Sequence, residues 1–298
     1  MKLSIITINY NNVEGLKKTL TSVAEQTYRD IEHVIIDGGS TDGSVDAIKS
    51  YVQKVESGKW KVESVLWVSE KDNGVYNAMN KGIEIALGRR VVNSFNRSEL
   101  VEDKNKVLPD YVQILNSGDI LAAPDVTERM VDALPEGADV LYGNMVKYDY
   151  TSKKVIGKSG KVDYSLRQYY RGTMNHDCCY IRRVLFEIYG LYDENLKIVS
   201  DWKWFLLAIG LGNVKPLYAD IDVTIFDASG ISETNLELRN KERRQVLEEV
   251  MPPAVLADYD RLAFPMEQYM QLKKYHLWGI AYFMERVLFK LNRWGLLR

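Results

Sequence analysis

The feature that most constrains the fold is a repeating pattern of strand and helix in the first half of the chain. Strand-like runs at 3–9, 31–37 and 62–70 are separated by segments in which apolar residues recur at helical spacing. Two further strand-like runs follow at 110–116 and 138–144. This repetition predicts an α/β fold: a mostly parallel, Rossmann-like sheet with right-handed crossovers and flanking helices.

Three helices are predicted between these strands, each with its apolar residues on one face. Asn11 or Asn12 caps the first helix, the turn at 40–44 leads into the second, and Gly88 ends the third. The predicted apolar faces comprise Leu16, Leu20, Val23 and Ala24; Ile48, Tyr51, Val52 and Val55; and Val75, Met79, Ile83 and Ala86.

The second half of the chain is less regular. The polar segment 89–109 is long for a connection in a compact domain, and we interpret it as a lid or a hairpin. A capped, buried helix is expected at 200–212 and an extended segment at 214–226. These elements complete the main domain, which we assign to 1–231.

A change of character marks the C-terminal region, 232–298, which we predict to be a helical extension. It begins with a charged helix at 233–251. Pro252 and Pro253 should end that helix, because proline removes a backbone donor and clashes with the preceding turn.

Composition excludes several classes of protein. Hydrophobic residues make up 46% of the chain and charged residues 27%, which is ordinary for a globular protein. The 39 basic and 41 acidic residues leave a net charge of -2, which argues against a nucleic-acid partner. Cys178 and Cys179 are adjacent and offer no disulfide framework, so we expect a reducing, cytoplasmic location.

Acidic or amide side chains follow each of the first four strands. In parallel sheets the carboxyl ends of the strands meet at one edge, where ligands bind. Carboxylates gathered there repel one another unless a cation or a donor-rich ligand intervenes. Mg²⁺ or Mn²⁺ prefers hard oxygen ligands, and Asp119 on its glycine turn is the candidate ligand. Neither GxGxxG nor GxxxxGK[ST] occurs, so dehydrogenase and P-loop functions are not favoured.

Several motifs, in this order, resemble those of family 2 glycosyltransferases with the GT-A fold, and in particular of bacterial enzymes of surface-polysaccharide assembly. The resemblance covers about 1–88 and 110–230. It rests on SIITINYNN, QTYRDIEHVIIDGGSTDGS, VSEKDNGVYNAMNKGIEIALG, ILNSGD and GLYDENLKIVSDWKWFL.

This resemblance implies inverting transfer of a hexose-type sugar from a nucleoside diphosphate, with uridine favoured, to a carbohydrate or lipid-linked acceptor. Asp201 would be the catalytic base, on a helix that Ser200 caps, and Asp119 the ligand of Mg²⁺ or Mn²⁺. The nucleotide pocket would contain Thr7, Asn9 and Tyr10, Asp37 would bond the base, and Ser40 and Asp42 would shape the loop that carries Asp37. Asp72, Asn80 and Lys81 would face the ribose, the diphosphate or the sugar. Asn116 would belong to the metal-binding motif, His176 would lie on the acceptor side, and Trp202 would lie in the core or in the pocket wall.

The chain also departs from the family pattern. Asn116 stands where the first acid of the metal motif is expected, and Gly38 and Asn77 replace acids found in many relatives. Asp177 follows His176 where an amide is common. One alternative function is that of a nucleotidyltransferase, which also uses an α/β sheet and a cation, although little of the expected Gly-rich basic loop follows the first strand. The other is that of a catalytically degenerate binding and assembly protein, which Asn116 keeps open.

The segment 269–298 combines an apolar face with basic residues, as in helices that lie in a membrane interface. The alternative is a helix packed on its own core or on a second subunit, so the oligomeric state stays open. We favour a peripheral position on the cytoplasmic face of the inner membrane. The basic residues are Lys273, Lys274, Arg286, Lys290, Arg293 and Arg298; the apolar face includes Leu277, Trp278, Ile280, Ala281, Phe283, Met284, Val287, Leu288, Leu291 and Trp294.

Overall fold

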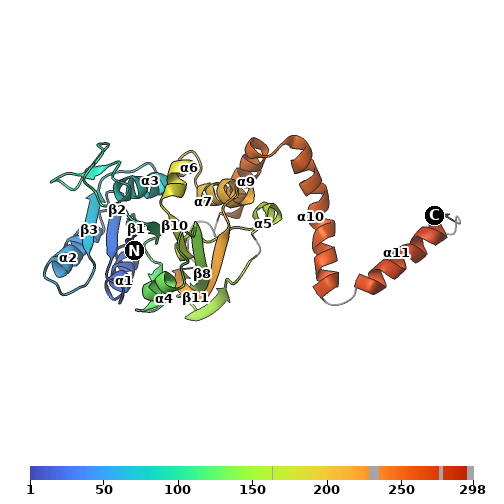
Figure 1. Ribbon diagram of the computed structural model, residues 1–298, viewed down its shortest axis with the longest axis horizontal. Coiled ribbons are helices and arrows are strands. Elements are labelled where there is room, and N and C mark those ends of the chain that lie inside the picture. The colour runs from blue at the N-terminus through green and yellow to red at the C-terminus, as the bar shows by residue number, and fades with distance from the viewer. Residues whose placement is uncertain (163, 228–234, 275–277, 294–298) are drawn as a thin grey trace. The chain divides into compact units, whose positions relative to one another are not determined.

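The computed structural model describes residues 1–162, 164–227, 235–274 and 278–293 (Figure 1). Contacts between residues divide the chain into two compact units, Met1–Arg243 and Arg244–Arg298. The helix α9, Leu236–Val250, begins in the first unit and ends in the second. The division at 231 and 232 that the sequence suggests stays a prediction.

The first unit is built on a mixed sheet with the strand order β3-β2-β1-β6-β10-β8-β11-β7, and β9 pairs with β8. β1 pairs in parallel with β2 and β6, and β2 pairs in parallel with β3. These are the strands expected from the sequence. Their bounds are β1 Leu3–Asn9, β2 Ile31–Asp37, β3 Ser64–Ser69, β6 Tyr111–Ile114, β7 Ile120–Leu121, β8 Val140–Asp149, β9 Lys154–Lys158, β10 Cys179–Arg182 and β11 Pro216–Asp227.

One pairing differs from a simple parallel sheet. The strand β10 lies between β6 and β8 and is antiparallel to both, so the fourth and fifth predicted strands are not neighbours. β10 has only four residues, too few for a periodic signal in the sequence. Its placement depends on the chain returning to the sheet after the β8–β9 hairpin.

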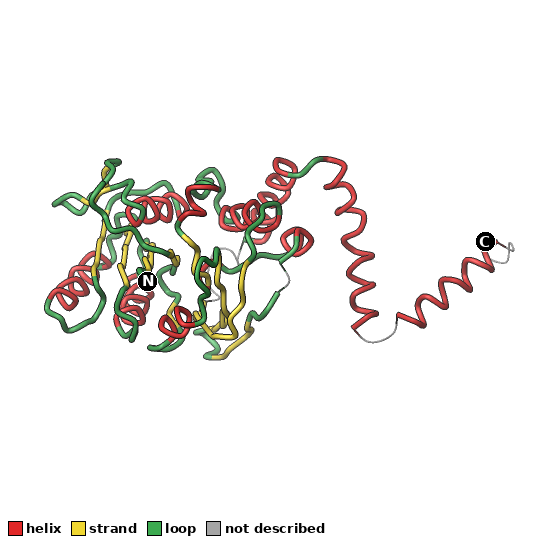
Figure 2. The backbone as a smooth tube through the Cα atoms, in the orientation of Figure 1, coloured by secondary structure: helices red, strands yellow, loops and turns green. Residues whose placement is uncertain are grey.

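Helices cover both faces of the parallel part of this sheet (Figure 2). α1, Val13–Ala24, and α2, Ser44–Glu56, pack around Ile35 of β2. The next residue, Ile36, faces α3, Val75–Ala86, where it lies close to Gly82. Successive strand residues point to opposite faces, so β2 anchors both layers. Asn12 caps α1, with its Oδ1 accepting from Gly15 N at 3.2 Å.

The segment 89–109 contains a short antiparallel hairpin of β4, Val91–Val92, and β5, Ser98–Glu99. A hairpin is one of the two forms that the sequence predicted for it. The remaining short elements of the first unit are α4 Val126–Asp132, α5 Leu166–Arg171, the 3-10 helix His176–Cys178, α6 Val184–Ile188, α7 Ser200–Phe205 and the π-helical turn Leu206–Gly210.

The second unit is helical. α10 spans Pro253–Lys274 and α11 spans Trp278–Arg293. The Pro252-Pro253 pair separates α9 from α10, as the sequence predicted. Among the helices that the structure describes, none has both the length and the apolar character needed to cross a membrane.

Candidate functional site

A pocket of about 720 Å³ opens at the carboxyl ends of β1, β2, β3 and β6. This is the edge where ligands bind in open α/β sheets. Of the predicted site residues, Asn9, Tyr10, Asp72 and Asn116 line it. Asn9 and Tyr10 lie at the end of β1, Asp72 follows β3 and Asn116 follows β6, so the pocket forms only when these strands are paired.

Two glycines bring the pocket walls together. A Cβ atom at Gly38 would lie 2.6 Å from Oδ2 of Asp72 and 3.2 Å from the Tyr10 ring. Gly38 therefore lets the first and third strand ends approach each other closely. Gly118 has a φ of 109°, which favours glycine, and makes the turn before Asp119.

Asp37, whose contact with the nucleotide base stays a prediction, organises the loop next to the pocket. Its side chain is completely buried and accepts from Asn9 Nδ2 at 2.9 Å and Ser69 Oγ at 2.8 Å. It also accepts from the backbone N and Oγ of Ser40. With its oxygens used in this way, Asp37 does not line the pocket. Asp42 accepts from Val13 N at 2.7 Å, which joins this loop to the start of α1.

Thr7 and Asn80 also have structural partners rather than a free face toward a ligand. Thr7 is fully buried, and its Oγ1 lies 3.0 Å from Nε2 of His33 in the core. The side chain of Asn80 donates to Tyr192 O and accepts from Tyr192 N, both at 2.9 Å. The contacts of Thr7 and Asn80 with the donor stay predictions, and in this structure both side chains are hydrogen-bonded inside the protein.

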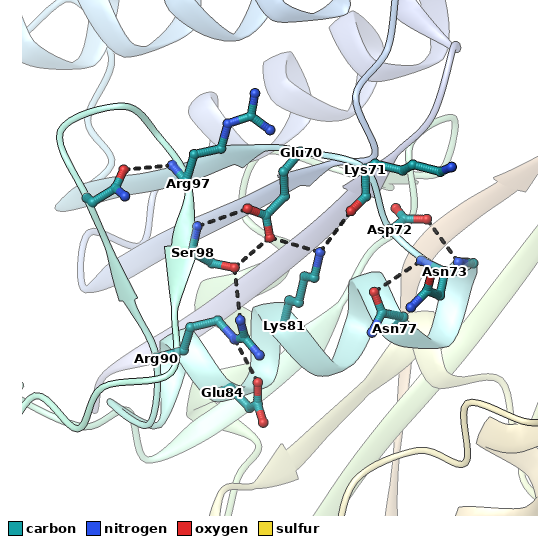
Figure 3. Close-up of polar contacts among 12 residues, drawn as sticks. Glu70, Lys71, Asp72, Asn73, Asn77, Lys81, Glu84, Arg90, Arg97 and Ser98 are labelled. Carbon is teal, nitrogen blue, oxygen red and sulfur yellow. Dashed lines mark hydrogen bonds and ion pairs between the residues drawn. The ribbon is translucent and has the colours of Figure 1, made fainter.

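Trp202 and Lys81 likewise have partners inside the protein. Trp202 is 1% exposed and donates its indole N–H to Tyr169 O, so it belongs to the core, the first of its two predicted places. Lys81 forms an ion pair with Glu70 at 2.9 Å and donates to Lys71 O at 3.3 Å (Figure 3). Neither side chain lines the pocket.

Asp201 lies in a hydrogen-bonded chain that reaches the pocket. Its Oδ1 accepts from the hydroxyl of Tyr76 at 2.8 Å, and its Oδ2 lies 3.1 Å from Nδ1 of His176. Nε2 of His176 lies 3.3 Å from the amide of Asn116, which lines the pocket. The side chains of Asp201 and His176 are both 17% exposed, so solvent still reaches the pair.

The electrostatics favour an ion pair between these two groups. Burial alone would raise the pKa of Asp201, but hydrogen bonds from His176 and Tyr76 outweigh it and lower the pKa. Burial alone would lower the pKa of His176, but its bond to Asp201 outweighs that effect and raises the pKa. Asn116 Oδ1 is buried without a partner, and turning the amide over would give the imidazolium Nε2–H an acceptor.

The local structure around Asp201 differs from the predicted capped helix. The residue before the first turn of α7 is Val199, and no side chain caps it. The Ser200 hydroxyl instead accepts from Asp193 N, so Ser200 fastens the preceding loop rather than the helix end. α7 continues into a π-helical turn at Leu206–Gly210 in place of one regular helix.

Tyr76 was missed by reasoning from the sequence. It lies beside Val75 in a helix whose apolar face accounts for the pattern, and its partner Asp201 is 125 residues away. The only available signal was its spacing of four residues from Asn80, which places both on the same side of α3.

Asp119 lies at the turn after β6, where Thr19 supports the backbone. Thr19 Oγ1 donates to Asp119 O at 2.7 Å, and Oδ1 of Asp119 accepts from Asp227 N at 3.1 Å. Burial and the nearby carboxylate of Asp177 raise the pKa of Asp119 well above its usual value. Within the described part of the chain, no group of three or more His, Cys, Asp or Glu side chains could hold a metal ion.

The roles predicted for Asp37, Asp119 and Asp201 require all three carboxylates to lie near one pocket. None of them lines the pocket directly, but each is connected to a residue that does. Asp37 accepts from Asn9, Asp119 N donates to Asn116 O at 3.1 Å, and Asp201 reaches Asn116 through His176. The three acids are therefore linked to the pocket through the residues that line it.

Comparison with solved structures defines the class of fold. The mannosyltransferase PcManGT from Pyrobaculum calidifontis, solved with GDP-Man and Mn²⁺, matches 94% of this chain and 73% of its own, with a TM-score of 0.59 and 15% identity. S. aureus TarS 1-349, solved with UDP-GlcNAc, matches 83% of this chain and 64% of its own, with a TM-score of 0.56 and 18% identity. The fold is that of the GT-A glycosyltransferases.

Sequence comparison then gives the family. Residues 4–94 match the model for glycosyl transferase family 2. An uncharacterized glycosyltransferase of Mycobacterium tuberculosis is 30% identical over 237 residues, which are 77% of this chain and 76% of that protein. The chain belongs to glycosyltransferase family 2.

Proposed function

We propose that this chain transfers a sugar, with inversion at the anomeric carbon, from a UDP-sugar to an acceptor hydroxyl during assembly of a cell-surface polysaccharide or glycolipid. The observation that carries the proposal is the chain Tyr76–Asp201–His176–Asn116, which links a held carboxylate to the strand-end pocket.

Asp201 is the catalytic base of this proposal. An alcohol is a poor nucleophile at neutral pH, so a carboxylate should accept its proton as it attacks. Tyr76 and His176 each occupy one oxygen of Asp201 and fix its orientation. Each carboxylate oxygen has a second lone pair, which leaves Asp201 able to accept a proton from the acceptor.

The pocket beside this chain suits a nucleoside diphosphate. Its volume of about 720 Å³ lies within the range of about 300–1,000 Å³ usual for small-molecule sites. Tyr10 is 67% exposed there and offers a ring face for a base. The solved relatives named above carry UDP-GlcNAc or GDP-Man, which supports a nucleotide sugar as the donor.

Asp119 is the proposed ligand for Mg²⁺ or Mn²⁺. Such ions often take one or two carboxylates and complete their shell with substrate phosphate and water, so a single buried carboxylate next to the pocket-lining residue Asn116 fits the donor set. A cation would also favour the charged form of Asp119, which burial opposes. When bound, it offsets negative charge on the departing diphosphate.

A membrane surface is the proposed partner of the C-terminal region. Among the side chains of α11 that the structure describes, Ile280, Phe283, Met284, Val287 and Leu288 are exposed. Their spacing of three and four residues forms one apolar stripe along the helix. Arg286 and Lys290 lie beside it, which suits an anionic bilayer and a lipid-linked acceptor.

A panel of nucleotide sugars tests the function. Thermal shifts measured with and without Mn²⁺ should identify a donor, because a ligand that binds only the folded state raises its apparent stability. The stabilising donor should then be consumed in a transfer or hydrolysis assay. Stabilisation without any turnover would instead identify the binding-protein alternative, and no stabilisation by any nucleotide sugar would contradict the proposal.

A further inference from the structure

A bound nucleoside diphosphate would bring more negative charge into the pocket than the charged residues that line it could neutralise. The described residues that line the pocket include two charged side chains, Lys71 and Asp72. A nucleoside diphosphate brings at least two negative charges, and the carboxylate of Asp72 would repel them. Unlike charges close to the ligand must compensate for that repulsion.

Lys81, which was predicted from the sequence to face the ribose, diphosphate or sugar, already forms an ion pair within the protein. Its Nζ pairs with Oε1 of Glu70 at 2.9 Å, and its side chain is only 11% exposed (Figure 3). The bond from its Nζ to Lys71 O at 3.3 Å holds the backbone of the pocket wall. Moving Lys81 to a ligand would leave Glu70 partly buried without its cation, which is costly.

The hairpin β4–β5 also hydrogen-bonds to Glu70, the residue before Lys71 in the pocket wall. Ser98 donates to Glu70 through its hydroxyl at 2.6 Å and its backbone N at 3.1 Å. Arg90 bonds Ser98 Oγ at 3.0 Å and Glu84 at 2.8 Å. Glu70 therefore joins the hairpin, α3 and the end of β3, and it fixes the backbone that carries Lys71.

The side chain of Lys71 differs from this network. It is exposed, and Figure 3 shows it extending away from the Glu70–Lys81 pair. In the described part of the protein, no hydrogen bond or ion pair engages its ammonium group. Lys71 thus combines a fixed backbone, a place at the pocket and an unused charge.

We propose that Lys71 is the protein cation that pairs with the diphosphate of the donor, whereas Lys81 is a positioning residue that holds the wall. This inference rests on the proposed function, since it takes a nucleoside diphosphate as the ligand. A charged hydrogen bond contributes about 1.5–3 kcal/mol, so its loss should weaken diphosphate binding by about 10- to 100-fold.

Calorimetric titration with UDP and with uridine, at constant Mg²⁺, tests the assignment. Lys71→Met should weaken UDP binding by about tenfold or more and change uridine binding by less than about twofold, because uridine lacks the phosphates. Lys71→Arg should restore most of the UDP affinity. Lys104→Met, which removes an exposed lysine that does not line the pocket, should leave both affinities unchanged.

The outcomes separate this inference from the proposed function. Equal UDP binding by the wild-type protein and Lys71→Met would overturn the role of Lys71 alone. A selective loss of UDP affinity in Lys81→Met but not in Lys71→Met would return the role to Lys81. If the folded wild-type protein bound neither UDP nor GDP, both the inference and the proposed function would fail.

Discussion

His176 Nδ1 lies 3.1 Å from Oδ2 of Asp201, and the other ring nitrogen of His176 faces Asn116 at the pocket. The pKa values of the two partners shift in opposite directions, as expected for a charged pair. This contact joins the carboxylate of Asp201 to the turn that carries Asn116.

Asp201→Asn should lower the transfer rate by about 10²–10⁴-fold, the usual cost of losing a general base. Nucleotide affinity should stay within about twofold of wild type, since Asp201 does not line the pocket. Steady-state kinetics and calorimetric titration with UDP measure the two quantities. A fall in nucleotide affinity as large as the fall in rate would contradict the assignment.

The pKa of His176 should lie above its ordinary value of 6.5, because the bond to Asp201 outweighs the effect of burial. NMR titration of the three histidines measures it. Asp201→Asn should bring the value down. Since the folded-state pKa is raised, the stability that this pair contributes is full below the unfolded pKa and is lost as pH rises through the folded pKa. Equal pH dependence of the unfolding free energy in wild type and Asp201→Asn would argue against the ion pair.

Asp119→Ala should abolish the dependence of UDP binding on Mn²⁺. Burial and Asp177 raise the pKa of Asp119, so a cation must displace a proton before it binds. The Mn²⁺ affinity of the wild-type protein with UDP should therefore rise with pH. Calorimetric titrations at several pH values measure this change, with Asp132→Ala, on an exposed helix position, as the control. An unchanged Mn²⁺ titration in Asp119→Ala would rule out the metal role.

His33 should make the fold sensitive to acid. Burial lowers its pKa to about 3, and its ring bonds Thr7 and the Tyr51 hydroxyl in the core. The unfolded chain binds a proton near pH 6.5, so stability should be lost as pH falls below that value, by about 1.4 kcal/mol per pH unit. Urea unfolding of wild type and His33→Gln between pH 7 and pH 5 should show the steeper loss in wild type. Parallel slopes would exclude this role.

The stripe on α11 should bind anionic vesicles. Phe283→Ser combined with Val287→Ser removes two exposed apolar side chains and should reduce partitioning by about tenfold or more. Cosedimentation with vesicles of mixed neutral and anionic lipid measures the effect. Lys104→Met controls for a change of charge outside α11. Equal partitioning of the double variant and wild type would leave α11 without a membrane role.

Much of the fold could be predicted because its signals are local. Alternating helical and strand patterns specify β1, β2 and β3 and the helices between them. The predicted apolar face of α1 is buried, and so is that of α3 except for Val75, which is half-buried and lines the pocket. The pocket at the strand ends also follows from the parallel order of these strands. β10 did not follow, because four residues cannot specify which neighbours they pair with.

The sequence by itself determined which polar residues lie at the carboxyl ends of the parallel strands. Its motifs also identified the family of the chain. Only the tertiary structure decided what each polar side chain does there. Asp37 and Lys81 look available in the sequence, yet both are held by partners inside the protein, whereas Tyr76 looks like a core residue and holds Asp201. The physical reason is that backbone periodicity depends on near neighbours, while the partner of a buried polar group comes from wherever the folded chain brings a donor or an acceptor within about 3 Å.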